Sequence, residues 1–105
     1  MKFTVDEFLV KLPITASEKR KQGVWDFEPF KKAGVSLVFF APRGVDYQTF
    51  HDEDEFYFTV RGTGDLIIGD ERHSFEAGDA FFVAATVPHH FENFTDDFAT
   101  WAIFF

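Results

Sequence analysis

From residue 24 to the C-terminus, the chain consists of short apolar runs, several of which alternate with polar residues at a period of two. Such alternation is typical of half-buried β-strands, and turn signals separate the runs about every eight to twelve residues. We expect strands over residues 24–30, 36–41, 47–51, 55–61, 66–68, 73–75, 80–84, 89–94 and 98–105. Many short strands spaced in this way predict an all-β sandwich or barrel.

Residues 3–12 differ from the rest because their pattern predicts a short helix. Thr4 and Glu7 have the spacing of a capping box, and Phe3 and Phe8 have that of a hydrophobic staple. The apolar residues form one helical stripe that ends before a proline: Val5, Phe8, Leu9 and Leu12. An isolated helix of this length is marginal in water, so we expect it to dock on an apolar surface. Residues 14–23 are expected to be irregular or to add one helical turn.

The predicted strand 55–61 has two chemically different faces. Its alternate side chains form two sets, Glu55, Tyr57 and Thr59 on one face and Phe56, Phe58 and Val60 on the other. We expect the first face to line a barrel interior that holds a polar site. The second face is too apolar to lie in water, so it should pack against the helix, the C-terminal strand or a second subunit. The sequence therefore predicts a homodimer. Separately, the glycines after this strand predict a tight hairpin loop over residues 62–64.

The composition limits both architecture and partners. A chain of 105 residues has room for one domain, which we assign to residues 1–105, with a helix and extension over 1–30 and the barrel over 35–105. The net charge of −8 argues against nucleic acid or an anionic membrane as partner. The absence of cysteine excludes thiolate ligands and cysteine nucleophiles. Neither a signal-peptide core nor an apolar run of membrane-spanning length is visible, so we expect a cytoplasmic protein.

Three residues form a candidate metal site: His51, Glu55 and His89. Two imidazoles and one carboxylate suit divalent iron, manganese, zinc, nickel or copper, and they leave coordination positions open. His51 and Glu55 flank the acidic turn 52–54, so we expect them on the two arms of one short hairpin, facing the same space. The alternative is that all three are ordinary polar residues at loop ends.

Two sequence motifs resemble those of the cupins, a family of jelly-roll β-barrels. In the first motif Gly44, His51, Glu55 and Gly62 match, with three residues between His51 and Glu55 and six between Glu55 and Gly62. The place of the first histidine of the motif is held by Thr49. The resemblance implies a small single-domain cupin, an all-β jelly-roll barrel preceded by the short N-terminal helix.

The second cupin motif lies in residues 78–93. Gly78, His89 and Asn93 match it in place, whereas Ala84 and Thr86 stand where the family has proline and glycine. The two motifs cover residues 44–93, and the first third of the chain lies outside them.

The resemblance implies that His51, Glu55 and His89 are ligands of a divalent metal ion. A threonine hydroxyl replaces imidazole poorly, so Thr49 leaves three of the usual four ligands, and water or substrate would take the vacancy. Tyr47 and Tyr57 share strand parity with the ligands, as Phe91 does with His89. We therefore expect Tyr47, Tyr57, Thr49 and Phe91 to line the pocket, where either tyrosine hydroxyl could bond a substrate. Plain core packing is the alternative for the aromatic residues.

Three functions remain open at this point. The first is a metal-dependent enzyme, an oxygenase or isomerase that acts on a small organic molecule held in the barrel, with Tyr47 or Tyr57 orienting the substrate. The second is a non-catalytic module that binds or senses a small ligand. The third is a structural oligomerising domain whose phenylalanines only fill interfaces. The retained Glu55 favours the enzyme, whereas Thr49 favours the binding module.

Overall fold

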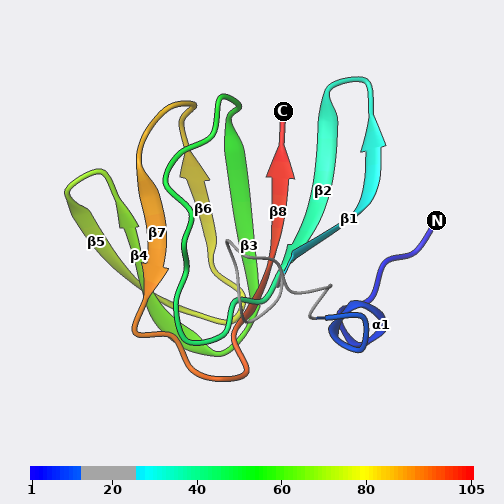
Figure 1. Cartoon of the computed structure of the whole chain (residues 1–105), viewed down its shortest axis with the longest axis horizontal. Coiled ribbons are helices and arrows are strands. Elements are labelled where there is room, and N and C mark those ends of the chain that lie inside the picture. The colour runs from blue at the N-terminus through cyan, green and yellow to red at the C-terminus, as the bar shows by residue number, and fades with distance from the viewer. Residues whose placement is uncertain (13–25) are drawn as a thin grey trace.

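The computed structural model describes residues 1–12 and 26–105, which form one short helix and eight strands. The elements in chain order are α1 (Val5–Leu9), β1 (Asp26–Lys32), β2 (Val35–Phe40), β3 (Glu55–Arg61), β4 (Thr63–Ile68), β5 (Glu71–Glu76), β6 (Ala80–Val83), β7 (His89–Glu92) and β8 (Ala99–Phe104). The strands form two antiparallel sheets, ordered β1-β2-β8-β3-β6 and β5-β4-β7 (Figure 1). The predicted jelly-roll β-barrel with a short N-terminal helix is confirmed.

The main core lies between the two sheets. Strands of both sheets, and the residue just before β8, contribute its buried side chains: Tyr57, Leu66, Phe75, Val83, Phe91, Phe98 and Ala102. Aromatic rings dominate this core, and Phe91 contacts Phe98 and Tyr57 at ring-centroid distances of 4.7 and 4.9 Å. Aromatic residues are well suited to half-buried strands because they fill the space between the facing sheets. The high phenylalanine content is thus partly explained by the interior of the barrel.

Strand β3 has the two faces that its sequence predicts. Glu55, Tyr57 and Thr59 are buried, whereas Phe56 and Phe58 are exposed by 37% and 41%. Strand β3 lies between β8 and β6 in the larger sheet, so its inner face looks into the barrel. The polar side chains at 55, 57 and 59 therefore belong to the interior, as expected.

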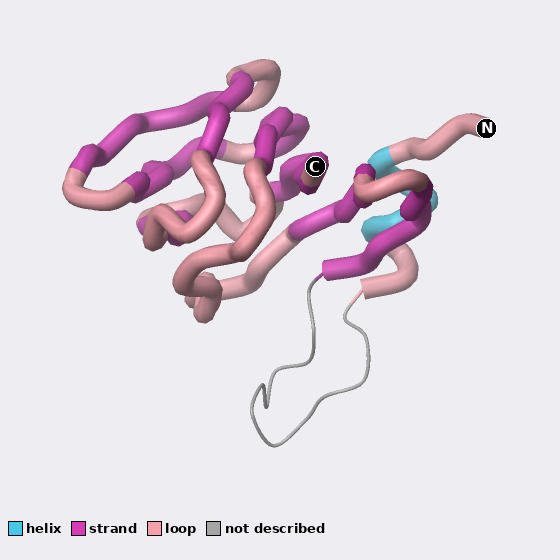
Figure 2. The backbone as a smooth tube through the Cα atoms, turned by 90° about the horizontal axis from the view of Figure 1, so that it is seen from above, coloured by secondary structure: helices cyan, strands magenta, loops and turns pink. Residues whose placement is uncertain are grey.

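The N-terminal helix is shorter than the predicted 3–12, because the helix spans only Val5–Leu9. The Thr4 hydroxyl caps it by accepting a hydrogen bond of 3.2 Å from the backbone N–H of Glu7. Phe8 is 3% exposed and packs with Phe39, Ala41 and Ala99 in a second core cluster. Figure 2 shows the helix beside β1 and β2. The predicted docking is confirmed, whereas the expectation for residues 14–23 lies outside the described residues.

Within residues 1–12 and 26–105, α1 is the single helix, and neither its length nor its apolarity would let it cross a membrane.

The predicted strand over residues 47–51 is wrong, because this segment belongs to an irregular connection between β2 and β3. The Asp46 carboxylate accepts a hydrogen bond of 3.0 Å from the backbone N–H of Gln48, which forms a side-chain-supported turn. Two separate backbone bonds then tie the segment to the chain around β7, His89 N–H to Thr49 O and Thr86 N–H to His51 O, both 2.7 Å. The turn breaks the alternation on which the strand prediction depends.

The predicted hairpin over residues 62–64 is also wrong, because β3 and β4 lie in different sheets. Gly62 has φ +81°, a left-handed conformation that redirects the chain from one sheet to the other. A Cβ at this position would lie 2.4 Å from Thr95 Oγ1 and 2.9 Å from Phe98 Cα. Glycine is thus required both by the conformation and by the close approach of the segment that leads into β8.

Candidate metal centre

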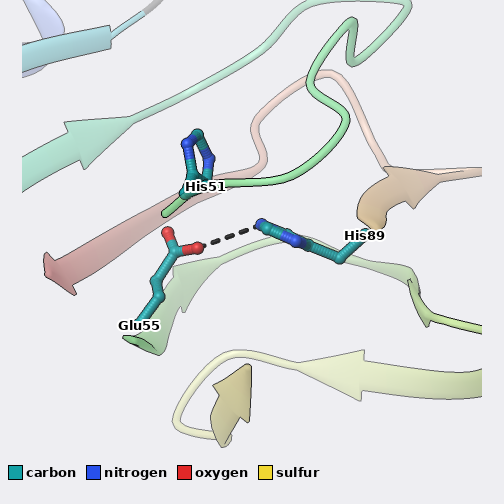
Figure 3. Close-up of side chains that lie close together, drawn as sticks. All are labelled: His51, Glu55 and His89. Atoms are coloured by element: carbon teal, nitrogen blue, oxygen red, sulfur yellow. Dashed lines mark ion pairs between the residues drawn. The ribbon is translucent and has the colours of Figure 1, made fainter. Parts of the chain in front are cut away.

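Three separate segments bring His51, Glu55 and His89 together. Glu55 begins β3, His89 begins β7, and His51 lies in the connection between β2 and β3 (Figure 3). One ligand atom from each residue lies within 4.8 Å of the other two. Donors bound to one ion at about 2.0–2.2 Å lie roughly 3–4 Å apart. The three side chains therefore have nearly the spacing of one coordination sphere, and the sequence prediction of their proximity holds.

Glu55 and His89 are deeply buried, and one polar atom of each faces the other. Oε1 of Glu55 and Nε2 of His89 lie 3.0 Å apart, and each side chain is 2% exposed. Among the residues that the structure describes, neither atom has a hydrogen-bond partner. Two unsatisfied polar atoms at this depth are costly unless a further group satisfies both. A divalent cation between a carboxylate oxygen and an imidazole nitrogen fits this requirement.

The backbone fixes the orientation of the His89 ring. Its Nδ1 lies 2.9 Å from the carbonyl oxygen of Val87, so a neutral ring donates Nδ1–H there and leaves Nε2 free to coordinate. Burial lowers the pKa of His89, but the contact with Glu55 and the bond to Val87 outweigh burial, and the net pKa is raised. The same carboxylate would thus attract either a proton or a metal ion to Nε2.

His51 is held less tightly than the other two. Its ring is half-buried and lies 4.9 Å from the Phe104 ring and 5.2 Å from the His89 ring, measured between centroids. Nε2 of His51 lies 3.2 Å from Oε1 of Gln48. The expected hairpin around residues 52–54 is absent, because only Glu55 belongs to a strand. His51 instead reaches the site from a connection that is anchored to β7.

Gln48 and Asp46 are site residues that the sequence patterns did not identify. The Tyr57 hydroxyl donates a bond of 3.0 Å to Oε1 of Gln48, whose amide nitrogen donates to Asp46 Oδ2. Asp46 also accepts 2.8 Å from the backbone N–H of Phe91. Strand parity would have directed Gln48 away from the ligands, and no motif marks it. The one local signal is Asp46, two residues before Gln48, because an Asp at that position can form a turn that interrupts the alternation of a strand.

Two of the three metal-site residues, His51 and Glu55, line a cavity of about 350 Å³, whereas His89 is not part of its lining. Apolar walls come from Val38, Phe40 and Phe104, and acidic side chains from Asp26, Glu28, Asp46, Glu53 and Glu55 are also present. Among the described residues, Lys31 and Arg43 are the lysine and arginine side chains in the lining. A cavity of this size is in the range of small-molecule sites, and acids outnumber bases in its lining.

The four other predicted site residues are placed differently from one another. Tyr57 is 1% exposed and lines the cavity, and Tyr47 lines it from a position that is 58% exposed. Thr49 is exposed and does not line the cavity. Phe91 is 1% exposed and lies in the core behind Tyr57, outside the cavity lining.

Tyr57 has the properties of a permanent hydrogen-bond donor. Complete burial, together with the negative charges of Glu55 and Asp46, raises its pKa well above the usual value. The phenol therefore keeps its proton at every physiological pH. Its hydroxyl is available to orient a bound molecule or the Gln48 amide beside the metal ligands.

Comparison with known proteins places this geometry in a family. Residues 36–105 match the family model described as a cupin domain. An uncharacterized protein of Streptomyces coelicolor is 32% identical over 60 residues, which are 57% of this chain and 57% of that protein. The match thus spans less than two thirds of that relative.

Two solved structures illustrate the similarity of fold. A cupin 2 conserved barrel domain protein from Salinispora arenicola has a TM-score of 0.65 at 22% identity, over 76% of this chain and 73% of that one. A variant of salicylate 1,2-dioxygenase from Pseudoaminobacter salicylatoxidans, in complex with gentisate, has a TM-score of 0.67 at 16% identity. The second match covers 75% of this chain but only 24% of the dioxygenase. Because the family model spans most of the barrel, including all three candidate ligands, the chain belongs to the cupin family.

Proposed function

We propose that this cupin binds a divalent metal ion through His51, Glu55 and His89 and acts as a metal-dependent enzyme, dioxygenase- or isomerase-like, on a small organic molecule. The observation that carries the proposal is the buried pair of unsatisfied atoms, Glu55 Oε1 and His89 Nε2. Of these two residues, Glu55 also lines the cavity, as His51 does. The ion would supply Lewis acidity or, if it is iron, manganese or copper, redox chemistry. The structural likeness to a gentisate-bound dioxygenase concerns the fold and supports only this general class.

The chain itself would bind and orient the substrate. Phe40, Phe104 and Val38 provide apolar surface that excludes water from the region beside the ligands. Tyr57 supplies a hydroxyl that stays protonated and that donates to Gln48 Oε1. A substrate oxygen that replaces Gln48 Oε1 as the acceptor could receive the same hydrogen bond. Tyr47 lies at a more exposed part of the lining and would contact the substrate near the entrance. These roles predict that changes at Tyr57 affect turnover more than changes at Tyr47.

A second candidate function is a non-catalytic module that binds or senses a small ligand. It is favoured by the 3.0 Å contact of Glu55 with His89, because a protonated His89 and an ionised Glu55 can neutralise each other without metal. The structural oligomerising domain predicts no cavity beside Glu55, so the cavity of about 350 Å³ argues against it.

The test reconstitutes the protein separately with Fe²⁺, Mn²⁺, Zn²⁺, Ni²⁺ and Cu²⁺ and screens small phenolic, sugar and keto-acid compounds for turnover. The enzyme proposal expects turnover with at least one metal and its loss in His51→Ala and His89→Ala. His73→Ala is the control, since His73 lies on β5 and does not belong to the cluster of His51, Glu55 and His89. Ligand binding that survives both substitutions, with no metal-dependent turnover, would instead establish the binding module.

We also propose that the chain forms a homodimer, in which a second copy of the chain covers an exposed apolar patch. Four aromatic side chains on the outer side of β3, β6 and the C-terminus are 37–49% exposed: Phe56, Phe58, Phe82 and Phe105. Phe56 contacts the other three at ring-centroid distances of 5.3–6.0 Å, so the four form one continuous apolar patch. The patch includes part of β6, one of the two edge strands of its sheet. A two-fold dimer would cover both the rings and the edge. A cytoplasmic location stays a prediction from composition.

A further inference from the structure

We propose that the amide oxygen of Gln48 is a fourth ligand of the metal ion that His51, Glu55 and His89 hold. The inference rests on the proposed metal site and deepens it. The motif leaves a vacancy where Thr49 replaces a histidine, but Thr49 is exposed and does not line the cavity. The residue before it reaches the site instead, because the turn at Asp46 changes the direction of this segment.

The orientation of the Gln48 amide is determined by its neighbours. A carboxylate can only accept hydrogen bonds, so the group that faces Asp46 Oδ2 must be the amide nitrogen. The Tyr57 hydroxyl donates to the opposite end of the amide at 3.0 Å, which is therefore the oxygen. Asp46 is itself fixed by the backbone N–H groups of Gln48 and Phe91, at 3.0 and 2.8 Å. The amide thus presents its oxygen towards His51 and Tyr57.

The position of this oxygen suits a ligand. Oε1 of Gln48 lies 3.2 Å from Nε2 of His51, and Oε1 of Glu55 lies 3.0 Å from Nε2 of His89. Two donors about 2.1 Å from one ion are separated by roughly 3.0–3.4 Å when the angle between their bonds to the ion is about 90–109°. Both pairs have this separation. An amide oxygen carries two lone pairs, so one can accept from Tyr57 while the other faces the ion.

A fourth ligand of this kind would shift metal preference. Two imidazoles with a carboxylate and an amide oxygen form a balanced nitrogen and oxygen set, whereas a third imidazole would favour zinc, nickel or copper. Amide and carboxylate oxygens suit harder ions. We therefore expect Mn²⁺ or Fe²⁺ to gain most from Gln48.

The competing explanation is that Gln48 merely accepts a hydrogen bond from a His51 Nε2–H. In that case a ring whose Nε2 carries a proton could coordinate only through Nδ1, and removal of the amide would leave the coordination sphere unchanged. The two explanations therefore differ in the number of ligands that the bound ion has, which spectroscopy can measure without reference to activity.

The test titrates the purified protein with Co²⁺ and Mn²⁺ alone, using a competing chromophoric chelator to obtain Kd, and records the visible spectrum of bound Co²⁺. The test variant is Gln48→Leu, which removes the amide at similar volume, and the matched control is Thr49→Val. We expect Gln48→Leu to raise Kd about ten- to a hundredfold and to change the Co²⁺ spectrum, with no change for Thr49→Val. Thermal unfolding of the metal-free proteins separates a folding defect from a lost ligand.

A second pair of variants makes the test independent of lost stability. Gln48→His should retain or improve Co²⁺ affinity, because an imidazole there can donate to Asp46 and coordinate with its other nitrogen. Thr49→His should leave affinity unchanged. Equal Kd and identical Co²⁺ spectra for wild type and Gln48→Leu would overturn the inference while leaving the three-ligand site intact. Affinity gained by Thr49→His but not by Gln48→His would overturn it too. A wild-type protein that binds no metal would overturn both proposals.

Discussion

Oε1 of Glu55 and Nε2 of His89 lie 3.0 Å apart in the interior of the barrel, and neither has a hydrogen-bond partner within residues 1–12 and 26–105. The two residues are 34 positions apart in the sequence and begin two strands that belong to different sheets. Burial of two polar atoms in this state is unfavourable unless a proton or a cation lies between them.

Substitution of Glu55 by Gln should weaken metal binding far more than any other change of one acid in the cavity. The substitution keeps the shape but removes the only carboxylate among the three candidate ligands, so we expect Kd for Mn²⁺ or Zn²⁺ to rise more than about a hundredfold. Isothermal titration with the metal-free protein measures the change. Glu53→Gln is the control, because Glu53 is exposed and also lines the cavity. Equal losses for the two variants would indicate a diffuse acidic effect rather than a ligand.

Metal affinity should fall as the pH is lowered. The ligand form of His89 is neutral, and its raised pKa means that protons compete for Nε2 at a higher pH than they would for an ordinary histidine. The loss should therefore begin above pH 6.5 and approach about tenfold per pH unit for each proton displaced. The change can be measured by chelator competition between about pH 5.5 and 8, a range that spans the usual pKa of histidine. An affinity that stays constant over this range would show that His89 is not a ligand.

Gly62→Ala should destabilise the fold more than an equivalent change at a glycine with open surroundings. Gly62 and Gly34 have nearly the same left-handed conformation, φ +81° and +82°, but only at Gly62 would a Cβ collide with backbone. We expect Gly34→Ala to cost about 1–2 kcal/mol for the conformation alone and Gly62→Ala about 1–3 kcal/mol more for the overlap. Urea unfolding of both variants measures the difference. Similar free energies of unfolding for the two variants would contradict the close approach of Gly62 to Thr95 and Phe98.

Phe8→Ala should detach the N-terminal helix from the larger sheet. Phe8 is 3% exposed and its ring contacts Phe27, Phe39 and Trp101, so its loss should cost about 3–5 kcal/mol. Val10→Ala serves as control because Val10 is 83% exposed. Thermal unfolding monitored by tryptophan fluorescence reports on this cluster directly. A Phe8→Ala protein as stable as the control would mean that the helix contributes no packing energy.

Phe82→Ser should convert the proposed homodimer to a monomer. The substitution places a polar group within the aromatic patch on the edge strand, where a second copy would otherwise cover it. Light scattering during gel filtration should give twice the chain mass of 12.1 kDa for wild type and for Val35→Ser, an exposed change outside the patch, and the chain mass for Phe82→Ser. A wild-type protein of 12.1 kDa would refute the dimer.

The parts of the molecule that could be predicted from the sequence are those governed by regular alternation or by a spaced motif. Residues 55–61 alternate in sequence and in burial, and the spacing of His51, Glu55 and His89 anticipated a cluster that the fold assembles. Strand parity failed at residues 47–51 because a single side chain, Asp46, forms a turn that no periodic pattern registers. Gln48 was missed for the same reason.

Sheet membership is the other feature that local patterns could not supply. Glycines after residue 61 indicate a sharp turn, but a turn into the neighbouring strand and a turn into the opposite sheet have similar sequences. The difference depends on what lies beside Gly62, namely Thr95 and the chain at Phe98, which are more than thirty residues away. Long-range contacts of this kind determine which sheet each strand joins, and a short stretch of sequence does not contain them.

The most direct test of the metal site is elemental analysis of untagged protein prepared without chelators, repeated after reconstitution and dialysis. We expect about one divalent ion per chain in wild type and in His73→Ala, and close to none in His51→Ala, Glu55→Gln or His89→Ala. A wild-type protein that retains no iron, manganese, zinc, nickel or copper after reconstitution would contradict it. Retention of the ion at equal occupancy by all three ligand variants would contradict it as well.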